Sequence, residues 1–240
     1  MKFTTLLAGG LLALLGTVCH AGAFSVTPVR LYFEPRDRAV AVTLVNEGDD
    51  ELALQTDIHS WTQDSVGVDQ LVLTDDLVVA PPSLRLAPHT KQVVRLTLLV
   101  PRDASRQMTY RLIVREVPEA FESKGTGIRL PIALVLNMPV FVTPAGARRR
   151  VECAWDTGPV ATPSVTCENT GTAYAQVREV ELKRAGAALA RFEGGMYLLP
   201  GARKTLPLKL LEGASLTPGA AEMAVVFDDR NTQRFDVRLP

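Results

Sequence analysis

Few residues of this chain have the types and spacing that catalysis needs. The 240-residue sequence holds three histidines, and only His59 and His89 lie beyond the first 23 residues. The sequence contains no His-Glu-x-x-His motif for zinc, no Gly-x-Ser-x-Gly nucleophile motif and no glycine loop for phosphate. Its acidic residues, such as the pair Asp75-Asp76, lack the spacing of a calcium loop and are expected in turns. We therefore predict that the protein is not an enzyme and needs no metal or cofactor.

Two cysteines, Cys153 and Cys167, remain beyond the N-terminal segment and lie on strands that we expect to be neighbours. In an oxidising compartment this pair predicts a disulfide. Closing a loop of this length stabilises a protein by about 3 kcal/mol in the chain-entropy model. Two buried free thiols are the alternative.

Residues 1–23 have the pattern of a cleaved signal peptide. Lys2 supplies the positive start, 6–18 form an apolar core too short to span a bilayer, and Ala21-Gly22-Ala23 is a small-residue cleavage site. A lipoprotein site at Cys19 is the alternative, but the residues before it match that pattern poorly. We therefore expect export, with cleavage after Ala23.

Composition favours an all-β chain without a charged footprint. Hydrophobic residues make up 47% of the sequence, and its 16 prolines and 17 glycines leave little room for long helical patterns. The formal net charge is +0, which gives no electrostatic signature of nucleic-acid or membrane binding.

The chain beyond residue 23 divides into two consecutive sets of short strands, which predicts two immunoglobulin-like β-sandwich domains. The first set is expected at 25–33, 39–46, 52–61, 77–80 with 83–86, 92–100, 109–117 and within 127–144. The second set is expected at 151–155, 164–168, 173–183, 189–192, 196–199, 204–210, 222–227 and 234–239. Small residues and three arginines separate the sets at 144–150. We therefore predict an N-terminal domain at 24–145 and a smaller C-terminal domain at 146–240.

The last strand of the first set is unusually apolar. Along 127–144, every second residue is a large uncharged side chain: Leu130, Ile132, Leu134, Leu136, Met138 and Val140. Proteins normally protect such a row with charges or prolines because an exposed strand invites another chain to pair with it. The strand is therefore either central in its sheet or kept available for a partner.

Arginines alternate with apolar residues on two other strands. Arg30 lies between Val29 and Leu31, and Arg111 and Arg115 are out of phase with the apolar residues of 109–117. Arg95 has the same relation to its neighbours in 92–100. These arginines are expected on the outer faces of the sheets.

Four motifs in this order resemble the PapD-like periplasmic chaperones of pilus assembly, and their arginine-containing strands are similar to the archaic branch. The motifs are Thr27-Pro28-Val29-Arg30, the segment 81–88 (PPSLRLAP), the segment 110–118 (YRLIVREVP) and the alternating stretch at 127–144. The resemblance covers essentially all of the chain beyond residue 23. It implies a periplasmic protein with its two sandwiches arranged in an L or boomerang shape.

The resemblance also implies a function. Members of this family hold a pilus subunit that lacks one strand and lend it their seventh strand until an outer-membrane usher receives the subunit. The implied donor side chains are Leu130, Ile132, Leu134 and Leu136, with Met138 nearer the linker. A second copy of the chain could also cap the donor strand by self-association, a question that the sequence leaves open.

In the family, two basic residues anchor the subunit's C-terminal carboxylate. Arg30 matches the first, whereas the position of the second, a lysine in many relatives, is Pro139 here. Arg111 is the candidate second anchor because a planar guanidinium can grip a carboxylate, and Arg95 is the reserve. For each arginine the alternative is a solvated surface side chain.

A secreted structural pilus component or an adhesin is the competing function. A pilus subunit would be one incomplete sandwich with an N-terminal extension, whereas this sequence has two strand sets and almost no extension before the first strand. The strand pattern therefore favours the chaperone.

Overall fold

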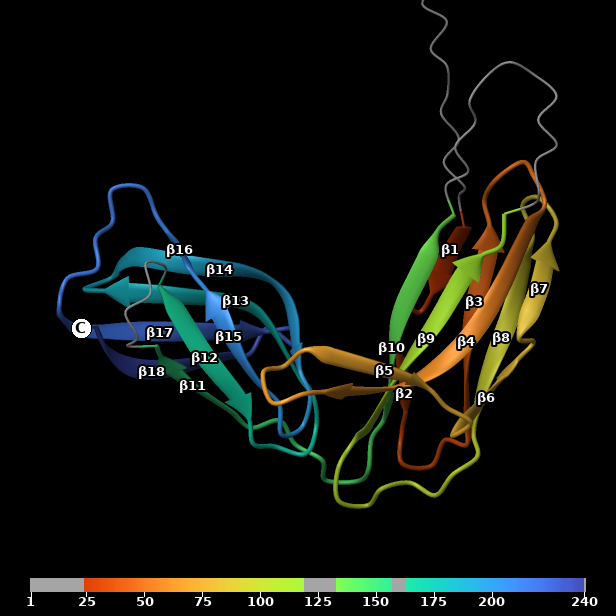
Figure 1. Cartoon of the computed structure of the whole chain (residues 1–240), viewed down its shortest axis with the longest axis horizontal. Coiled ribbons are helices and arrows are strands. Elements are labelled where there is room, and N and C mark those ends of the chain that lie inside the picture. Colours follow the sequence, from red (N-terminus) through yellow and green to blue (C-terminus); the bar gives the residue numbers. More distant parts are fainter. Residues whose placement is uncertain (1–23, 119–132, 157–162, 240) are drawn as a thin grey trace, which may run out of the picture.

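The computed structural model describes residues 24–118, 133–156 and 163–239, which form strands, turns and loops without a helix (Figure 1). None of these residues belongs to a helix that could cross a membrane. The predicted all-β fold class is confirmed. The predicted signal peptide and residues 127–132 of the predicted seventh strand lie outside the described residues.

Strands β1 to β10 form two sheets, which together we call the N-terminal sandwich. One sheet has the order β1-β3-β8-β6, and the other has the order β2-β10-β9-β4-β5, with β7 also paired to β4. The bounds are β1 Phe24–Thr27, β2 Leu31–Phe33, β3 Ala39–Asn46, β4 Leu52–Gln63, β5 Asp69–Leu73, β6 Leu77–Ala80, β7 Ser83–Leu86, β8 Lys91–Leu98, β9 Met108–Glu116 and β10 Val135–Val142.

The alternation of side chains explains why these segments form strands. Along β4, Leu52, Leu54, Thr56 and Ile58 are buried, whereas the residues that alternate with them are half-buried or exposed. The inner faces of the two sheets meet in one core, to which β10 contributes Met138 and Val140. Apolar surface removed from water in this way stabilises the fold by roughly 25 cal/mol per Å².

Prolines interrupt two segments, one at 25–33 that we predicted as a single strand and one at 77–86 that we predicted to be broken at Pro81-Pro82. Pro28 separates β1 from β2, and Pro81-Pro82 separate β6 from β7. In both cases the two halves pair in different sheets. Because proline has no backbone N–H to donate, the ladder is interrupted there and the chain crosses from one sheet to the other.

Strand β5 was not predicted, because all five of its residues are exposed and show no alternation of burial. It pairs with the end of β4 in an antiparallel hairpin, with Trp61 opposite Leu71 and Gln63 opposite Asp69. In Figure 1 this hairpin reaches from the N-terminal sandwich toward the second sandwich.

Strands β11 to β18 form the C-terminal sandwich, with one sheet in the order β11-β12-β15 and the other in the order β16-β14-β13-β17-β18. The bounds are β11 Val151–Trp155, β12 Ser164–Asn169, β13 Ala175–Arg184, β14 Ala187–Leu198, β15 Arg203–Pro207, β16 Lys209–Leu210, β17 Gly219–Phe227 and β18 Thr232–Leu239. The prediction of two strands at 189–192 and 196–199 was wrong, because β14 continues through Gly194-Gly195. The predicted strand at 204–210 is divided into β15 and β16.

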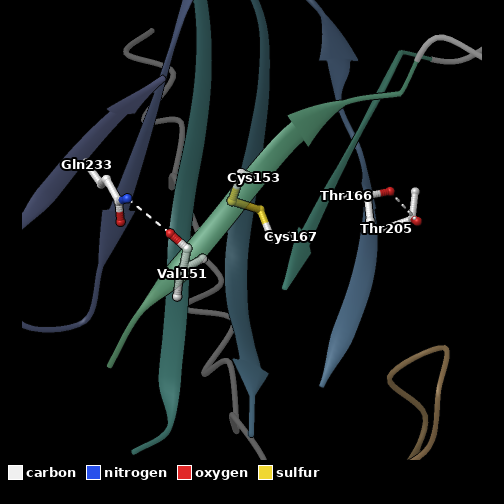
Figure 2. The surroundings of a disulfide bond; sticks show 6 residues. All are labelled: Val151, Cys153, Thr166, Cys167, Thr205 and Gln233. Atoms are coloured by element: carbon white, nitrogen blue, oxygen red, sulfur yellow. Dashed lines mark hydrogen bonds between the residues drawn. A yellow bond between two sulfur atoms is a disulfide. The ribbon is translucent and has the colours of Figure 1, made fainter. Parts of the chain in front are cut away.

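The predicted disulfide is present (Figure 2). Cys153 of β11 lies directly opposite Cys167 of β12, their Cα atoms are 4.1 Å apart, and the S–S distance is 2.00 Å. The bridge therefore links two neighbouring strands of the three-stranded sheet.

The two sandwiches are arranged as the arms of an L, joined at one end by the linker that follows β10 (Figure 1). Two aromatic residues of the N-terminal sandwich, Trp61 and Phe141, are fully buried and pack in the hydrophobic core of the C-terminal sandwich. The two sandwiches are therefore connected by a packed interface as well as by the linker.

Candidate functional site

One edge of β10 is only partly paired. The strand pairs antiparallel with β9 over its whole length, from Val135 to Val142. On its other side, β2 pairs with it in parallel only at Val140–Val142. Among the described residues, Val135–Pro139 therefore have no strand on that side, and this segment, which we call the free edge, offers unpaired backbone groups.

The side chains of β10 change from buried to accessible along the strand. Met138 is buried in the core of the N-terminal sandwich. Leu136 and Leu134 are half-buried and pack against the same core. The predicted donor side chains Leu130 and Ile132 lie outside the described residues. The apolar row therefore begins as a core face at Met138 and becomes partly accessible toward Leu134.

Five aromatic rings meet where the two sandwiches join, at one end of the free edge. Phe141 stacks on Tyr174 with ring centroids 4.0 Å apart. The ring centroid of Tyr32 lies 5.5 Å from that of Phe141. Trp61 contacts Tyr197 edge to face at 5.1 Å. We call these five residues the junction cluster; Tyr174 and Tyr197 come from the C-terminal sandwich, and the other three come from the N-terminal one.

Hydrogen bonds from two glutamines fix the same interface. The amide of Gln63 donates to the carbonyl of Tyr197 at 3.0 Å and accepts from the N–H of Leu199 at 2.9 Å. The backbone N–H of Gln107 donates to the carbonyl of Thr172 at 2.8 Å, and its side-chain oxygen accepts from the N–H of Tyr174. The orientation of the two sandwiches is therefore specified by directional bonds as well as by packing.

Arg111 lies on β9 and packs against the junction cluster. Its guanidinium carbon is 3.6 Å from the centroid of the Trp61 ring and 5.3 Å from that of Tyr197. Its closest carboxylate among the described residues is Asp69, at 3.9 Å. Burial lowers the pKa of Arg111, although the group stays protonated in water. Arg111 is therefore a buried cation whose charge is only weakly compensated.

Arg30 lies between β1 and β2 and crosses the interface. One terminal nitrogen donates to Oδ2 of Asp228 at 2.6 Å, and the other donates to Oε1 of Gln176 at 2.7 Å. Burial lowers the pKa of Arg30, but bonds to the side chains of Tyr32 and Asp228 outweigh this effect and raise the pKa overall. Unlike Arg111, Arg30 already has a close carboxylate partner.

The ring of Tyr197 lies close to both arginines, since the guanidinium carbon of Arg30 is 5.8 Å from its centroid. Two of the three predicted anchor residues are thus brought to the same place. The third, Arg95, is exposed on β8, in the other sheet of the N-terminal sandwich, opposite Ala41 and Ala80. The structure does not bring Arg95 to the junction cluster.

The partners of these arginines were not among the residues predicted from the sequence. Asp228, Gln176, Tyr174 and Tyr197 lie in the C-terminal sandwich and are far from Arg30 and Arg111 in the sequence. Trp61 was identified only as the end of a strand. No local spacing signals these contacts, because they exist only once the two sandwiches have packed together.

The described residues contain no group of His, Cys, Asp or Glu side chains that could hold a metal ion. Of the two histidines considered in the sequence, His89 lies in a turn with φ of 55° and pairs with Asp49 at 3.0 Å. His59 lies on β4, opposite Arg111 in the β4–β9 ladder.

Several solved structures share this fold. A chain of the CsuC–CsuE complex of chaperone and tip adhesion subunit, from archaic chaperone-usher Csu pili of Acinetobacter baumannii, is 17% identical, with a TM-score of 0.66 over 90% of this chain and 98% of that chain. The CupB2 chaperone of Pseudomonas aeruginosa is 19% identical, with a TM-score of 0.57 over 90% of this chain and 100% of that chain. A chain of the Salmonella enterica complex of SafA pilin with the SafB chaperone is 16% identical, with a TM-score of 0.59 over 90% and 96%.

No curated protein sequence matches the chain. A model of the family described as pili and flagellar-assembly chaperone, PapD N-terminal domain, matches residues 23–148, which is more than half of the sequence. The residues matched include all ten strands of the N-terminal sandwich, the free edge and both arginines at the junction cluster. The chain therefore belongs to the PapD-like family of pilus-assembly chaperones.

Proposed function

We propose that this protein is a periplasmic chaperone that binds pilus subunits, lends them the strand at about 128–142 and anchors their C-terminal carboxylate at the junction cluster. Delivery of the subunit to an outer-membrane usher completes the proposed role. Membership of the chaperone family supports the general role, and two similar structures are complexes of a chaperone with a tip adhesion subunit or a pilin.

The observation that carries this proposal is the position of the free edge next to Arg111. On the side away from β9, Val135–Pro139 have no strand partner among the described residues, and Pro139 at the end of this segment lies directly opposite Arg111. A subunit strand that pairs here and runs parallel to β10 would end beside Arg111. Its terminal carboxylate would then meet a weakly compensated guanidinium, which can bind it through two parallel hydrogen bonds.

Apolar side chains supply much of the proposed binding free energy. Full burial of an aliphatic side chain is worth roughly 1.5 to 3 kcal/mol, so the set Leu130, Ile132, Leu134 and Leu136 would contribute about 6 to 12 kcal/mol before costs. Leu134 and Leu136 already pack partly on the chaperone's own core, so the free energy that each gains on binding lies at the lower end of this range. A substantial part of this free energy is offset by the entropy lost when the partner becomes ordered and the two molecules lose rigid-body freedom. Backbone hydrogen bonds along the free edge supply the rest of the binding free energy.

Export fits this role. The proposed signal peptide at 1–23 would carry the chain to the periplasm, where the Cys153–Cys167 disulfide is chemically stable. In the absence of a subunit, self-association of two chaperones would cover the same free edge.

Co-expression with a pilin-like subunit, followed by sizing of the periplasmic extract, tests the proposal. We expect a soluble one-to-one complex that Ile132→Asp abolishes, because a carboxylate cannot enter the apolar groove of the subunit. Val78→Asp is the matched control, since Val78 is 45% exposed on β6 in the opposite sheet. A subunit that is stable alone, or a complex that Ile132→Asp leaves intact, would contradict strand donation.

A further inference from the structure

Two neighbouring acids in the turn between β17 and β18 bind different arginines. Asp228 pairs with Arg30 at 2.6 Å, and Asp229 pairs with Arg149 at 3.1 Å. Arg149 belongs to the linker between the sandwiches, whereas Arg30 comes from the N-terminal sandwich. Asp228 is therefore the acid of this turn that reaches across the interface to one of the two arginines at the junction cluster.

Asp228 is held firmly in this position. Its backbone N–H donates to the carbonyl of Gln176 at 3.1 Å, and Gln176 also accepts from Arg30 through its side chain. The hydroxyl of Tyr174 donates to Oδ2 of Asp228 at 3.1 Å, and it lies 2.8 Å from the hydroxyl of Tyr32. The side chain of Asp228 is only 16% exposed. A carboxylate is thus fixed on Arg30 by bonds that do not depend on any ligand.

Arg111 differs because no described carboxylate forms a hydrogen bond with it. Asp69, at 3.9 Å, is directed elsewhere, since Oδ1 accepts from the amide of Gln63 at 2.7 Å and lies 3.8 Å from Nζ of Lys204. Of the two arginines beside Tyr197, one is therefore neutralised by a close acid and the other is not.

We propose that Asp228 acts as an internal carboxylate that occupies Arg30 and thereby directs the C-terminal carboxylate of a bound subunit to Arg111. This inference rests on the function proposed above. An incoming carboxylate at Arg30 would have to share a guanidinium whose charge Asp228 already compensates, because Asp228 is tethered in place and competes at a high effective concentration. Within the described parts of the chain, no acid is held against Arg111 in this way. Asp228 is thus a positioning residue that sets where the end of the subunit strand lies.

Calorimetric titration of the mature protein with a synthetic peptide tests this role. The peptide copies the C-terminal strand of the pilin-like subunit used in the co-expression experiment and is made as the free acid and as the C-terminal amide. Asp228→Asn keeps the shape and the acceptor oxygen but removes the charge, so Arg30 becomes a second available cation. We expect the free acid to bind about tenfold more tightly to this variant, which corresponds to 1.4 kcal/mol, and the amide to bind as before.

Two further variants test whether the gain in affinity is specific to Asp228 and requires Arg30. Asp229→Asn removes the neighbouring charge of the same turn and is expected to bind both peptides as the unaltered protein does. Arg30→Ala combined with Asp228→Asn is expected to lose the gain. A gain that survives in this double variant, or one that appears equally in Asp229→Asn, would overturn the role assigned to Asp228.

The remaining outcomes separate this inference from the proposed function. Suppose that the unaltered protein binds the acid more tightly than the amide but Asp228→Asn does not increase the affinity for the acid. Asp228 then only ties the sandwiches together, and this inference is wrong while the proposed function stands. A lower unfolding temperature of Asp228→Asn with equal weakening of both peptides leads to the same conclusion. If the unaltered protein binds acid and amide equally, carboxylate anchoring itself is wrong.

Discussion

Pro139 of β10 lies directly opposite Arg111 of β9, and alternation places both side chains on the face of the sheet that points away from the N-terminal core. The resemblance to the PapD-like chaperones implies that Pro139 stands where many relatives carry a lysine. Under the proposed function, Arg111 would supply from the neighbouring strand the cation that Pro139 cannot. This exchange is the basis of the first prediction.

Arg111→Ala is expected to weaken the complex with a subunit by about 2 kcal/mol or more, roughly thirtyfold, because it removes a cation from a buried ionic contact. Adding Pro139→Lys to this variant is expected to restore part of the binding. Arg234→Ala, which removes a surface arginine paired with Glu222 on an edge of the C-terminal sandwich, serves as the control. Dissociation constants from titration of the subunit peptide provide the measurement, and unchanged binding by Arg111→Ala would exclude Arg111 as an anchor.

Alkaline pH is expected to destabilise the interface between the sandwiches. Burial, reinforced by the hydrogen bond with Tyr32, raises the pKa of Tyr174, and burial also raises the pKa of Tyr197. A tyrosine in the unfolded chain has a pKa of about 10, so above that pH the unfolded state binds fewer protons than the folded state. The resulting stability is fully present below about pH 10 and declines as the pH rises.

Urea unfolding at a series of alkaline pH values checks this sign. Tyr174→Phe keeps the stacked ring but removes the ionisable hydroxyl, so its free energy of unfolding is expected to fall less steeply above about pH 10. The same variant loses the bonds to Tyr32 and Asp228, and we expect it to be about 1 kcal/mol less stable at neutral pH. Parallel pH profiles of the two proteins would contradict the assignment.

Removal of the disulfide is expected to cost about 3 kcal/mol of stability in the chain-entropy model. Cys153→Ala with Cys167→Ala should lower the urea midpoint of the C-terminal sandwich, because the bridge joins two strands of its smaller sheet. A reducing agent should lower the midpoint of the unaltered protein and leave that of the variant unchanged. Equal midpoints under reducing and oxidising conditions would show that the bridge does not stabilise the protein.

Gly67→Ala is expected to separate the β4–β5 hairpin from the C-terminal sandwich. Gly67 has a φ of +79°, and a Cβ atom there would lie 2.7 Å from the backbone oxygen of Arg203. Gly186→Ala is the matched control, because Gly186 has a φ of +84° and no atom within 4 Å of the added Cβ. Both variants carry the backbone strain of a left-handed residue, so any additional loss of stability in Gly67→Ala reports the contact between the sandwiches.

Small-angle scattering provides the second readout for this pair. We expect a broader distribution of distances for Gly67→Ala than for Gly186→Ala, because only the former weakens the join. Identical stability and identical scattering of the two variants would mean that the hairpin does not help to hold the angle.

Much of the fold could be predicted from the sequence because most strands are buried on one face. The strands at 39–46, 77–80, 83–86 and 151–155 were predicted with the bounds that the structure gives. The period of two is strong there, since each strand places alternate apolar side chains in a core. Strand β5 escaped detection because neither of its faces is buried, and its pairing with β4 depends on backbone bonds that leave no pattern in the sequence.

For residues of the candidate site, the sequence could predict the strand and the face on which each side chain lies, but not its tertiary contacts. Alternation correctly gave the outward direction of Arg111 and Arg95, but it does not say which of the two sheets a strand joins. For this reason Arg95, on β8, was grouped with residues that lie in the other sheet. The contact between Arg30 and Asp228 joins residues 198 positions apart and exists only in the packed molecule.

The packing of Trp61 and Phe141 within the C-terminal core has a consequence for recognition. Because rings and directional amide bonds from both sandwiches hold the angle of the L, this site is formed before any partner arrives. Under the proposed function, the loss of conformational entropy on binding falls almost wholly on the incomplete subunit. The chaperone then acts as a rigid template. Its selectivity depends on which subunit can fold against it, and not on domain closure around the bound subunit.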